Sequence, residues 1–308
     1  HWMFSYGNRV RCNYFWCRNK KINFKEKISS KMDIKYNITK IKNSKKDNTK
    51  DFVSVEEPLE MRLKFQKNGK IENQNISITM RTPGDDENLI RGFLFNEGII
   101  ENINEIDKVE HIGEPVGDYN LQNIIEATIN KTENIDIGKL RKNFVTNSSC
   151  GVCGKTSLDS IEILKKNKLD RNFPKIKHDI ITKSPELLMD NQSEFSRTGG
   201  IHASALIDQS GDVIAIKEDV GRHNALDKLI GYSLKENLLN SEKQFIACSG
   251  RLNFELIQKG LMAEIAFMVG VGAPTSLAVD LAKRFDITLL GFVKEDSYNV
   301  YNNIDRVI

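Results

Sequence analysis

The regular alternation of short apolar strands and helices in the C-terminal half is the feature that most constrains the fold. The strand-like runs "QFIACSG" and "ITLLGFV" alternate with the helical patterns "NALDKLIGYSL" and "PTSLAVDLAKRF". Between them, "NFELIQKGLMAEIAFMV" is apolar on most faces, which indicates a buried helix. Such alternation implies a largely parallel sheet covered by helices, with right-handed crossovers. We therefore predict an α/β domain with α/β/α layers over residues 171–308.

A smaller α+β domain is expected before it, over residues 51–143. The stretch "EMRLKFQKNGKIENQNISITM" alternates polar and apolar residues around Asn-Gly, the strongest short signal for a hairpin. In "RTPGDDENLIRGFLFNEGII", Thr82 can cap a helix and Pro83 fits its first position. Two further strands are expected near residues 109–112 and 124–129. Overall the chain is thus predicted to be α+β, with the α/β domain as its larger part.

Charge is distributed unevenly along the chain. Residues 1–50 hold 14 Lys or Arg and 3 Asp or Glu, whereas the remainder holds 31 and 39. A basic arm of this kind is able to bind nucleic acid, but we interpret it as an unstructured tail, with residues 42–50 disordered. No nucleic-acid partner is expected. No membrane partner is expected either, because the sequence has no run of about 18 apolar residues.

Cysteine usage indicates the compartment and the chemistry. Five cysteines, an odd number, do not form a disulfide framework, so a reducing cytoplasm is the expected location. Cys150 and Cys153 form a C-x-x-C in residues 144–170, which we predict as a loop followed by a helix at about 158–166. Zinc needs four ligands and no second C-x-x-C exists, so no metal is expected. A phosphate-binding P-loop is excluded because Ser149 stands where its first glycine is required.

Thiol chemistry then remains for this pair. The helix that follows and Lys155 both favour the thiolate, which is the reactive form. Gly151 and Gly154 leave the turn sterically open. Sulfur relay, thiol–disulfide exchange and a simple clasp for a cofactor or partner all fit these residues.

Several turns of the larger domain are suited to anions. "KEDVGRHNALDKLIG" brings five polar residues to the point where a strand meets a helix: Glu218, Asp219, Arg222, His223 and Asn224. Asp219 and His223 either bind a ligand or only hold the junction. "ACSGRLNFE" and "GVGAPTSLA" each leave an apolar segment, turn through small residues and start a helix, where free N–H groups bind anions. Arg251 can add a bidentate phosphate contact. Together these turns suggest a large phosphorylated ligand, such as a nucleotide-bearing cofactor.

In this order, "SSCGVCGK", "TGGIHASAL", "KEDVGRHNALDKLIG", "SGRLNFELIQKG", "GAPTSLAVDLA" and "LLGFVKEDSYNVY" resemble the FdhD family, the formate dehydrogenase accessory sulfurtransferases. The resemblance covers about residues 56–301, including "RTPGDDENLIRGFLFNEGII" of the first domain, and leaves residues 1–50 outside. It implies a homodimer whose second domain has a cytidine-deaminase-like architecture without that family's zinc ligands.

The resemblance also implies a function and a site. A cysteine desulfurase would load sulfur as a persulfide on Cys150, with Cys153 assisting or resolving it. The sulfur would pass to the molybdenum of a bis(molybdopterin guanine dinucleotide) cofactor before that cofactor enters formate dehydrogenase. The cofactor-binding residues would be His223 and Arg251 together with Phe292, Val293, Lys294, Glu295, Asp296 and Ser297. Ser297 departs from the family pattern, since many members carry a basic residue at this position. A thiol–disulfide oxidoreductase and a cofactor chaperone remain the alternatives.

Overall fold

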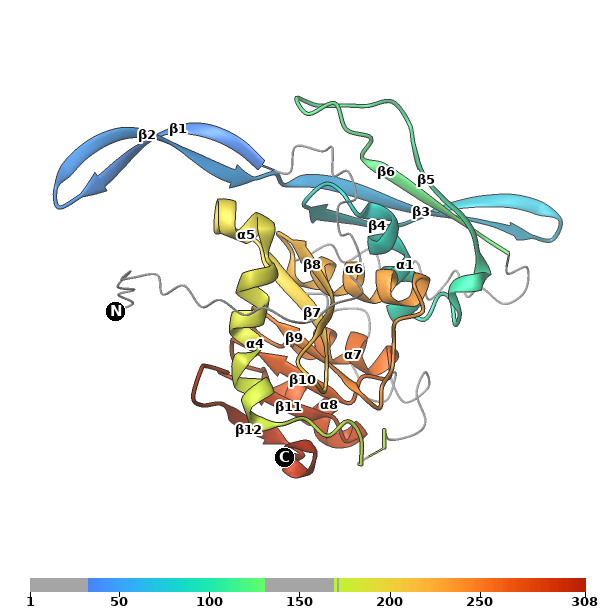
Figure 1. Cartoon of the computed structure of the whole chain (residues 1–308). Coiled ribbons are helices and arrows are strands. Elements are labelled where there is room, and N and C mark those ends of the chain that lie inside the picture. The colour runs from blue at the N-terminus through green and yellow to red at the C-terminus, as the bar shows by residue number, and fades with distance from the viewer. Residues whose placement is uncertain (1–32, 131–168, 171) are drawn as a thin grey trace, which may run out of the picture.

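The computed structural model describes residues 33–130, 169–170 and 172–308. Three parts are visible in it: a protruding two-stranded ribbon, a four-stranded sheet with one helix, and a six-stranded sheet between helices (Figure 1). No helix within these ranges is both long and apolar enough to cross a membrane. The domain boundaries expected at 143 and 170 fall at or beside undescribed residues and stay predictions.

The four-stranded sheet forms the first domain, and the order of its strands is β4-β3-β6-β5. Alternate side chains of β3 point inward and are fully buried, as the polar–apolar pattern predicts. They pack with apolar side chains of helix α1 in one core. The predicted hairpin, helix and two later strands are confirmed as β3 (Glu57–Lys67), β4 (Lys70–Arg81), α1 (Asp86–Asn96), β5 (Ile106–Ile112) and β6 (Ile124–Ile129), with the short helix η1 (Ile103–Glu105) before β5.

The predicted start of α1 is wrong. The helix begins at Asp86, and neither Thr82 nor Pro83 lies in its first turn. Thr82 is buried, and its hydroxyl accepts a hydrogen bond from the backbone N–H of Val220 at 3.1 Å. Its own N–H donates to the carboxylate of Asp219 at 3.2 Å. The hydroxyl that looked like a helix cap therefore joins the two domains instead.

The six-stranded sheet of the second domain lies between two helical layers. Helix α4 covers one face, and α6, α7 and α8 cover the other, each with its own apolar core. The predicted α/β/α layering is thus confirmed. Its elements are α4 (His178–Asn191), α5 (Ser193–Thr198), β7 (His202–Asp208), β8 (Val213–Asp219), α6 (Arg222–Lys235), β9 (Gln244–Cys248), α7 (Phe254–Met262), β10 (Phe267–Gly270), α8 (Ser276–Phe285), β11 (Thr288–Gly291), β12 (Asn299–Asn302) and η2 (Ile304–Arg306).

The sheet is mixed rather than largely parallel. Its strand order is β12-β11-β10-β9-β7-β8, and the parallel neighbours in it are β9 with β10 and β10 with β11. Strands β7 and β8 form a hairpin, and a tight turn forces its two strands to be antiparallel. Strand β12 follows β11 after the loop of residues 292–298 and pairs with it in the antiparallel direction. The helix-connected strands were predicted correctly. The stretch "IHASALIDQSGDVIAIKED" also predicts two strands around a turn, and β7 and β8 confirm this.

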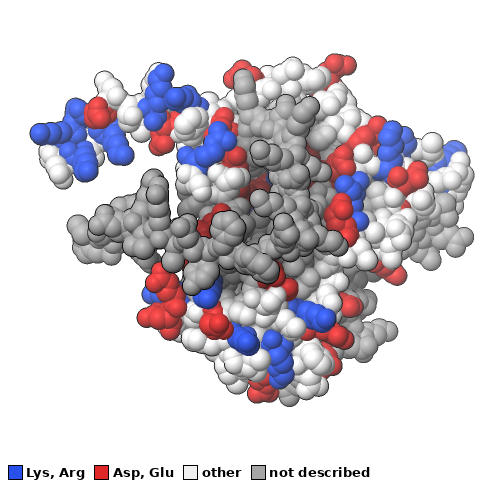
Figure 2. Space-filling model, viewed as in Figure 1, with Lys and Arg blue, Asp and Glu red and all other residues white. Residues whose placement is uncertain are grey.

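The basic arm is the second correction. Residues 33–54, which we call the arm, form a regular antiparallel ribbon of β1 (Asp33–Lys42) and β2 (Lys45–Ser54), so the disorder expected over residues 42–50 is wrong. Asn43 and Ser44 turn the chain with left-handed backbone angles, which Asn tolerates well. At its base Ser54 bonds Thr198 of α5 at 2.7 Å. Basic side chains lie along the part of the arm that protrudes from the body (Figure 2). Residues 1–32 lie outside the description.

Candidate functional site

The C-terminal ends of the three parallel strands carry the loops that were predicted to bind a ligand. The N–H of Gly272, after β10, donates to the carbonyl of Gly250, after β9, at 3.2 Å. The N–H of Phe292, after β11, donates to the carbonyl of Gly272, also at 3.2 Å. A Cβ on Gly272 would lie only 2.9 Å from the backbone nitrogen of Arg251, so the loops touch backbone to backbone. They form one continuous surface at the sheet edge where α/β proteins bind ligands.

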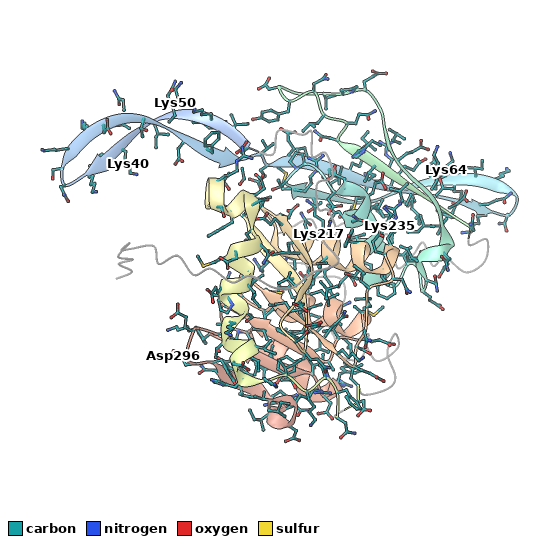
Figure 3. All side chains as sticks on the ribbon, in the orientation of Figure 1. Lys40, Lys50, Lys64, Lys217, Lys235 and Asp296 are labelled. Carbon is teal, nitrogen blue, oxygen red and sulfur yellow. The ribbon has the colours of Figure 1, made fainter. Side chains whose placement is uncertain are left out.

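The loop formed by residues 292–297 presents most of its side chains to solvent. Val293 is buried and anchors it, whereas Lys294, Glu295, Asp296 and Ser297 are exposed, and Asp296 lies at the outer edge of the molecule (Figure 3). The N–H of Lys294 donates to the carbonyl of Ser297 at 2.8 Å and closes a turn. Phe292 has φ 55° and is 45% exposed. An aromatic residue in this backbone region is a strained exception, and such exceptions gather at binding sites.

His223 is a partly buried member of this edge. Its Nε2 lies 2.9 Å from the carboxylate of Glu255 and 3.0 Å from the amide of Asn253, which caps α7. The hydrogen bond to His223 holds the pKa of Glu255 below its ordinary value despite burial. His223 therefore ties the start of α6 to the start of α7, while Arg251 between them is exposed.

Asp219 is a structural residue, which answers the question that the sequence left open. It is fully buried, and its carboxylate forms an ion pair with Lys228 at 2.6 Å. The same carboxylate accepts hydrogen bonds from the N–H of Thr82, the N–H of Gly221 at 2.8 Å and the side-chain amide of Asn224 at 3.1 Å. No oxygen is left for a ligand, so Asp219 holds the junction.

Arg222 and His202 lie at the same edge. The sequence places Arg222 at the predicted junction of strand and helix, whereas His202 was missed. His202 heads β7, and since β7 is antiparallel to β9, it lies where β9 ends. Its Nδ1 is 3.5 Å from the hydroxyl of Ser249. Burial, with the charges of Arg222 and His223 nearby, lowers the pKa of His202. In the sequence, "HAS" at residues 202–204 lacks the Glu of the H-x-E signature of zinc deaminases, so the local pattern assigns His202 no role. Only the β7–β9 pairing would have revealed its position.

Cys248 is the cysteine that lies in the described part of the chain. Cys150 and Cys153 lie outside the described residues, so their predicted role stays a prediction. Cys248 is buried at the end of β9, and burial raises the pKa of its thiol to about 11. A thiol with so high a pKa is a poor nucleophile at neutral pH. Within the described part of the chain, no three His, Cys, Asp or Glu side chains gather as metal ligands.

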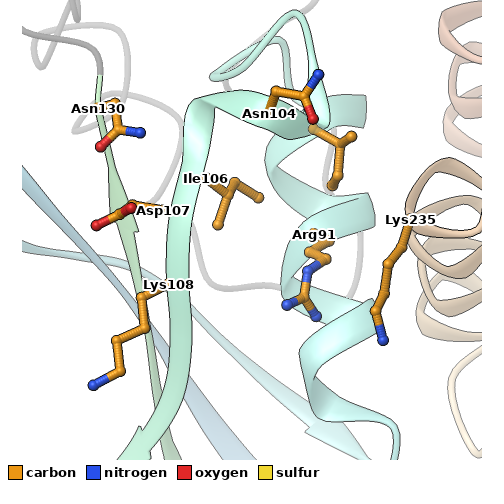
Figure 4. Close-up of a pocket in the computed structure, with 8 residues that line it drawn as sticks. Arg91, Asn104, Ile106, Asp107, Lys108, Asn130 and Lys235 are labelled. Atoms are coloured by element: carbon orange, nitrogen blue, oxygen red, sulfur yellow. The ribbon is translucent and has the colours of Figure 1, made fainter.

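A separate hollow of about 350 Å³ lies between the first domain and the end of α6 (Figure 4). It is lined by Arg91, Ile103, Asn104, Ile106, Asp107, Lys108, Asn130 and Lys235. Its three basic side chains are already paired with carboxylates, Arg91 with Glu87, Lys108 with Glu110 and Lys235 with Glu236. None of the predicted site residues that the structure describes lines this hollow.

The fold and the edge together define a two-domain α/β protein with basic and imidazole groups at the ends of its parallel strands. Comparison of the sequence with known protein families identifies the family. Residues 56–308 match the model of the FdhD/NarQ family, and the chain belongs to this family.

Relatives are similar over nearly their whole length. A protein of Saccharolobus solfataricus named sulfur carrier protein FdhD is 38% identical over 273 residues, 89% of this chain and 97% of the relative. A protein of the same name from Picrophilus torridus is 42% identical over 84% of this chain and 92% of its own. The fold is also that of a crystal structure assigned as a formate dehydrogenase accessory protein from Desulfotalea psychrophila, with a TM-score of 0.66 and 21% identity over 90% of this chain and 100% of that one.

Proposed function

We propose that this protein is a sulfur carrier that serves formate dehydrogenase. The observation that carries the proposal is the pair Cys150 and Cys153 in a chain of the FdhD/NarQ family whose relatives are named sulfur carrier proteins. The ligand-suited edge of the second domain supports it, because a carrier needs a binding surface for its acceptor as well as a thiol. The predicted thiolate of Cys150 is the group that takes up sulfur.

The loading step is a thiol exchange. The thiolate of Cys150 attacks the outer sulfur of a persulfide on a cysteine desulfurase, and the sulfur–sulfur bond of the donor breaks to leave a donor thiolate. Release follows the same rule. The thiolate of Cys153 attacks the inner sulfur of the persulfide, so that a Cys150–Cys153 disulfide forms and sulfide leaves. The two electrons that reduce the outgoing sulfur to sulfide come from the oxidation of Cys150 and Cys153 to this disulfide.

The sulfur acceptor in this proposal is the molybdenum of a bis(molybdopterin guanine dinucleotide) cofactor, bound as cargo. Its guanine nucleotide portion fits the edge of the sheet, where Arg251 is exposed and Phe292 offers an aromatic face. Lys294 lies in the same exposed loop. His223 contributes less directly, because Glu255 already occupies one of its ring nitrogens. We further propose that the protein acts in the cytoplasm as a homodimer.

Mass spectrometry of the protein tests the loading step. Incubation with a cysteine desulfurase and cysteine is expected to add one sulfur atom to the wild type and none to Cys150→Ala. Cys248→Ala is the matched control, since Cys248 is buried and its raised pKa keeps it protonated. A wild type that gains only an internal disulfide would instead be a thiol–disulfide oxidoreductase, and the carrier proposal would fail.

A complementation assay separates the carrier from a chaperone. Cys150→Ala is expected to abolish formate dehydrogenase maturation in cells lacking the native carrier. Intact maturation would mean that the protein only clasps the cofactor.

Binding of guanine nucleotides is expected to weaken in Arg251→Ala and in a variant with residues 292–297 replaced by a Gly/Ser loop. If affinity is unchanged in both, the cofactor is bound elsewhere.

A further inference from the structure

The arm, residues 33–54, is a charged surface that the proposed function does not use. It holds six Lys and three Asp, whereas residues 55–308 hold 31 Lys or Arg and 38 Asp or Glu. It projects from the body with basic side chains along it (Figures 1 and 2). All six of its lysines are exposed: Lys35, Lys40, Lys42, Lys45, Lys46 and Lys50. The arm therefore attracts anions that the rest of the chain repels.

The protein does not neutralise these lysines itself. Among the described residues, no ion pair engages a lysine side chain of the arm, and Lys35 lies 5.4 Å from the centre of the Phe52 ring. Two of the three carboxylates of the arm have partners of their own. Asp33 pairs with Arg197, and Asp51 accepts a hydrogen bond from the N–H of Phe52 at 2.9 Å. The lysine ammonium groups are therefore available to a partner.

Contacts at its base hold the arm in place. An isolated two-stranded hairpin is at best marginally stable in water. Here the hydroxyl of Ser54 donates to that of Thr198 at 2.7 Å, and Asp33 is paired with Arg197. The guanidinium group of Arg197 also lies 5.6 Å from the centre of the Phe52 ring. The expectation of no nucleic-acid partner accompanied the interpretation of this segment as an unstructured tail, and an ordered ribbon removes that ground.

Lysines lie on both faces of the ribbon. Side chains alternate between the faces along each strand, and directly paired residues share a face. The β1–β2 register therefore places Lys40, Lys42 and Lys45 on one face, and Lys35, Lys46 and Lys50 on the other. A flat surface, such as a membrane or the side of a protein, meets only one face at a time. A groove with phosphates along both walls contacts the lysines of both faces.

The other side chains of the arm also favour a phosphate backbone. Ser, Thr and Asn side chains commonly bond phosphate oxygens, and the middle of the ribbon carries Asn37, Thr39, Asn48 and Thr49. Protein interfaces are instead depleted of Lys and rely on aromatic and Arg anchors. The aromatic residues of the arm, Tyr36 and Phe52, lie near its base, so its outer part has no aromatic platform on which single-stranded bases stack.

The width of a two-stranded ribbon distinguishes the two kinds of duplex. The major groove of B-form DNA admits such a ribbon, whereas the deep major groove of A-form RNA is too narrow for side chains to read. Each strand of the arm has ten residues, which gives the ribbon a length of about 33 Å. That length covers roughly one turn of a DNA duplex, about 34 Å.

We propose that the arm binds duplex DNA without sequence preference, with the ribbon in the major groove and its lysines on the phosphates of both walls. Contacts between lysine and phosphate carry no base information, so affinity should be similar for unrelated sequences. If about four or five lysines are neutralised, the logarithm of the binding constant should fall by about 4 for each tenfold rise in salt. The inference is independent of the proposed function, because it uses no residue of the sulfur-carrying site.

Fluorescence anisotropy of the full chain with a labelled DNA duplex tests the proposal. We expect micromolar affinity at about 50 mM salt that is largely lost by about 200 mM. Lys42→Gln/Lys45→Gln removes the two lysines that face each other beside the turn. In this variant the affinity at low salt should fall by about tenfold, and the magnitude of the salt slope should decrease by about 2.

The β3–β4 hairpin offers a matched control. Lys67 and Lys70 are exposed and pair across a two-residue turn, as Lys42 and Lys45 do in the arm. The two hairpins lie at opposite ends of the molecule (Figure 1). Lys67→Gln/Lys70→Gln changes the net charge by the same amount, and its affinity for DNA should stay that of the wild type. Unfolding midpoints measured in parallel show that both variants are folded.

Three results would overturn the inference. The first is no binding of the DNA duplex at low salt. The second is an equal loss of affinity in the two double variants, which would show that only bulk charge matters. The third is tighter binding to a single-stranded oligonucleotide, duplex RNA or vesicles of anionic lipid than to duplex DNA, which would give the arm another partner. Failure of sulfur loading on Cys150 would refute the proposed function and leave these DNA measurements unaffected.

Discussion

Asp86 organises the start of α1 through charge. Its carboxylate accepts hydrogen bonds from Arg81 at 3.0 Å and lies 3.0 Å from Nε2 of His111. Burial alone would raise the pKa of Asp86, but the hydrogen bond from His111 and the charge of Arg81 outweigh it and hold the pKa below its ordinary value. A buried ion pair of this kind is costly to break, because the remaining charge is left unpaired.

We predict that Asp86→Asn lowers the free energy of unfolding at pH 7 by about 3 kcal/mol. The folded pKa lies below the unfolded one, so the charged form stabilises the protein above about pH 4, and this contribution is lost as the pH falls through the folded pKa. The difference in the free energy of unfolding between the wild type and Asp86→Asn, measured by urea titration, should therefore decrease toward pH 3. Glu87→Gln is the control, since Glu87 is half exposed and forms only a surface pair with Arg91.

Lys259 and Asp227 form a second buried ion pair, beside Asn96 at the C-terminal end of α1. Its ammonium group lies 2.8 and 3.0 Å from the two oxygens of Asp227, which also accepts from Asn96 at 2.6 Å. Lys259→Met keeps the volume but leaves a buried carboxylate unpaired, so we predict a loss of about 3 kcal/mol in chemical denaturation. The double variant Lys259→Met/Asp227→Leu should recover most of it. If the double variant is destabilised as much as Lys259→Met alone, the pair stabilises the protein through something other than charge.

At the scale of elements, α1 and α6 approach each other through two glycines. A Cβ on Gly92 would lie 1.9 Å from the backbone oxygen of Asp227, and a Cβ on Gly231 would lie 2.0 Å from that of Asn88. Both contacts are with backbone atoms, which cannot rotate away. The two helices, one from each domain, are therefore in direct backbone contact.

Gly92→Ala is expected to force these helices apart and to destabilise the protein by about 1–3 kcal/mol, although alanine favours a helix. The unfolding midpoint in urea measures this. Gly200→Ala is a matched control, because the nearest atom to its Cβ would be 3.9 Å away and its backbone angles suit alanine. Equal midpoints for the wild type and Gly92→Ala would mean that α1 shifts freely on α6.

These elements show what the sequence could predict. Apolar periodicity located the β3–β4 hairpin, α6 and the helix-connected strands, because burial of one face leaves a local pattern. The prediction that Thr82 caps α1 was wrong because its hydroxyl accepts a hydrogen bond from Val220, which is 138 residues away. The prediction of disorder over residues 42–50 was wrong because backbone pairing of β1 with β2 orders this lysine-rich segment without burial of apolar side chains. His202 was missed because its partners come from other strands, and long-range pairings leave no mark on local sequence.

At the scale of the whole molecule, a few buried contacts join the two domains beside the ligand-binding edge. Lys228 of α6 is nearly fully buried and donates to the carbonyl of Thr82 at 2.9 Å, while its ion pair with Asp219 fixes the loop before α6. Asn224 adds a hydrogen bond to the carbonyl of Met80 at 2.8 Å. The first domain thus supports the residues that precede Arg222, so the position of the edge depends on both domains.

We predict that Lys228→Met uncouples the domains, because it removes the donor to Thr82 and leaves Asp219 without its counter-ion. In the wild type, native-state hydrogen exchange should report similar opening free energies for β3 and β9. In Lys228→Met the value for β3 should fall below that for β9 by more than about 1 kcal/mol. Lys235→Met, in the last turn of the same helix and half exposed, is the control and should keep the two values together. If β3 and β9 still open together in Lys228→Met, the domains are held by their helix contact through Gly92 and Gly231, and the polar contacts only set its orientation.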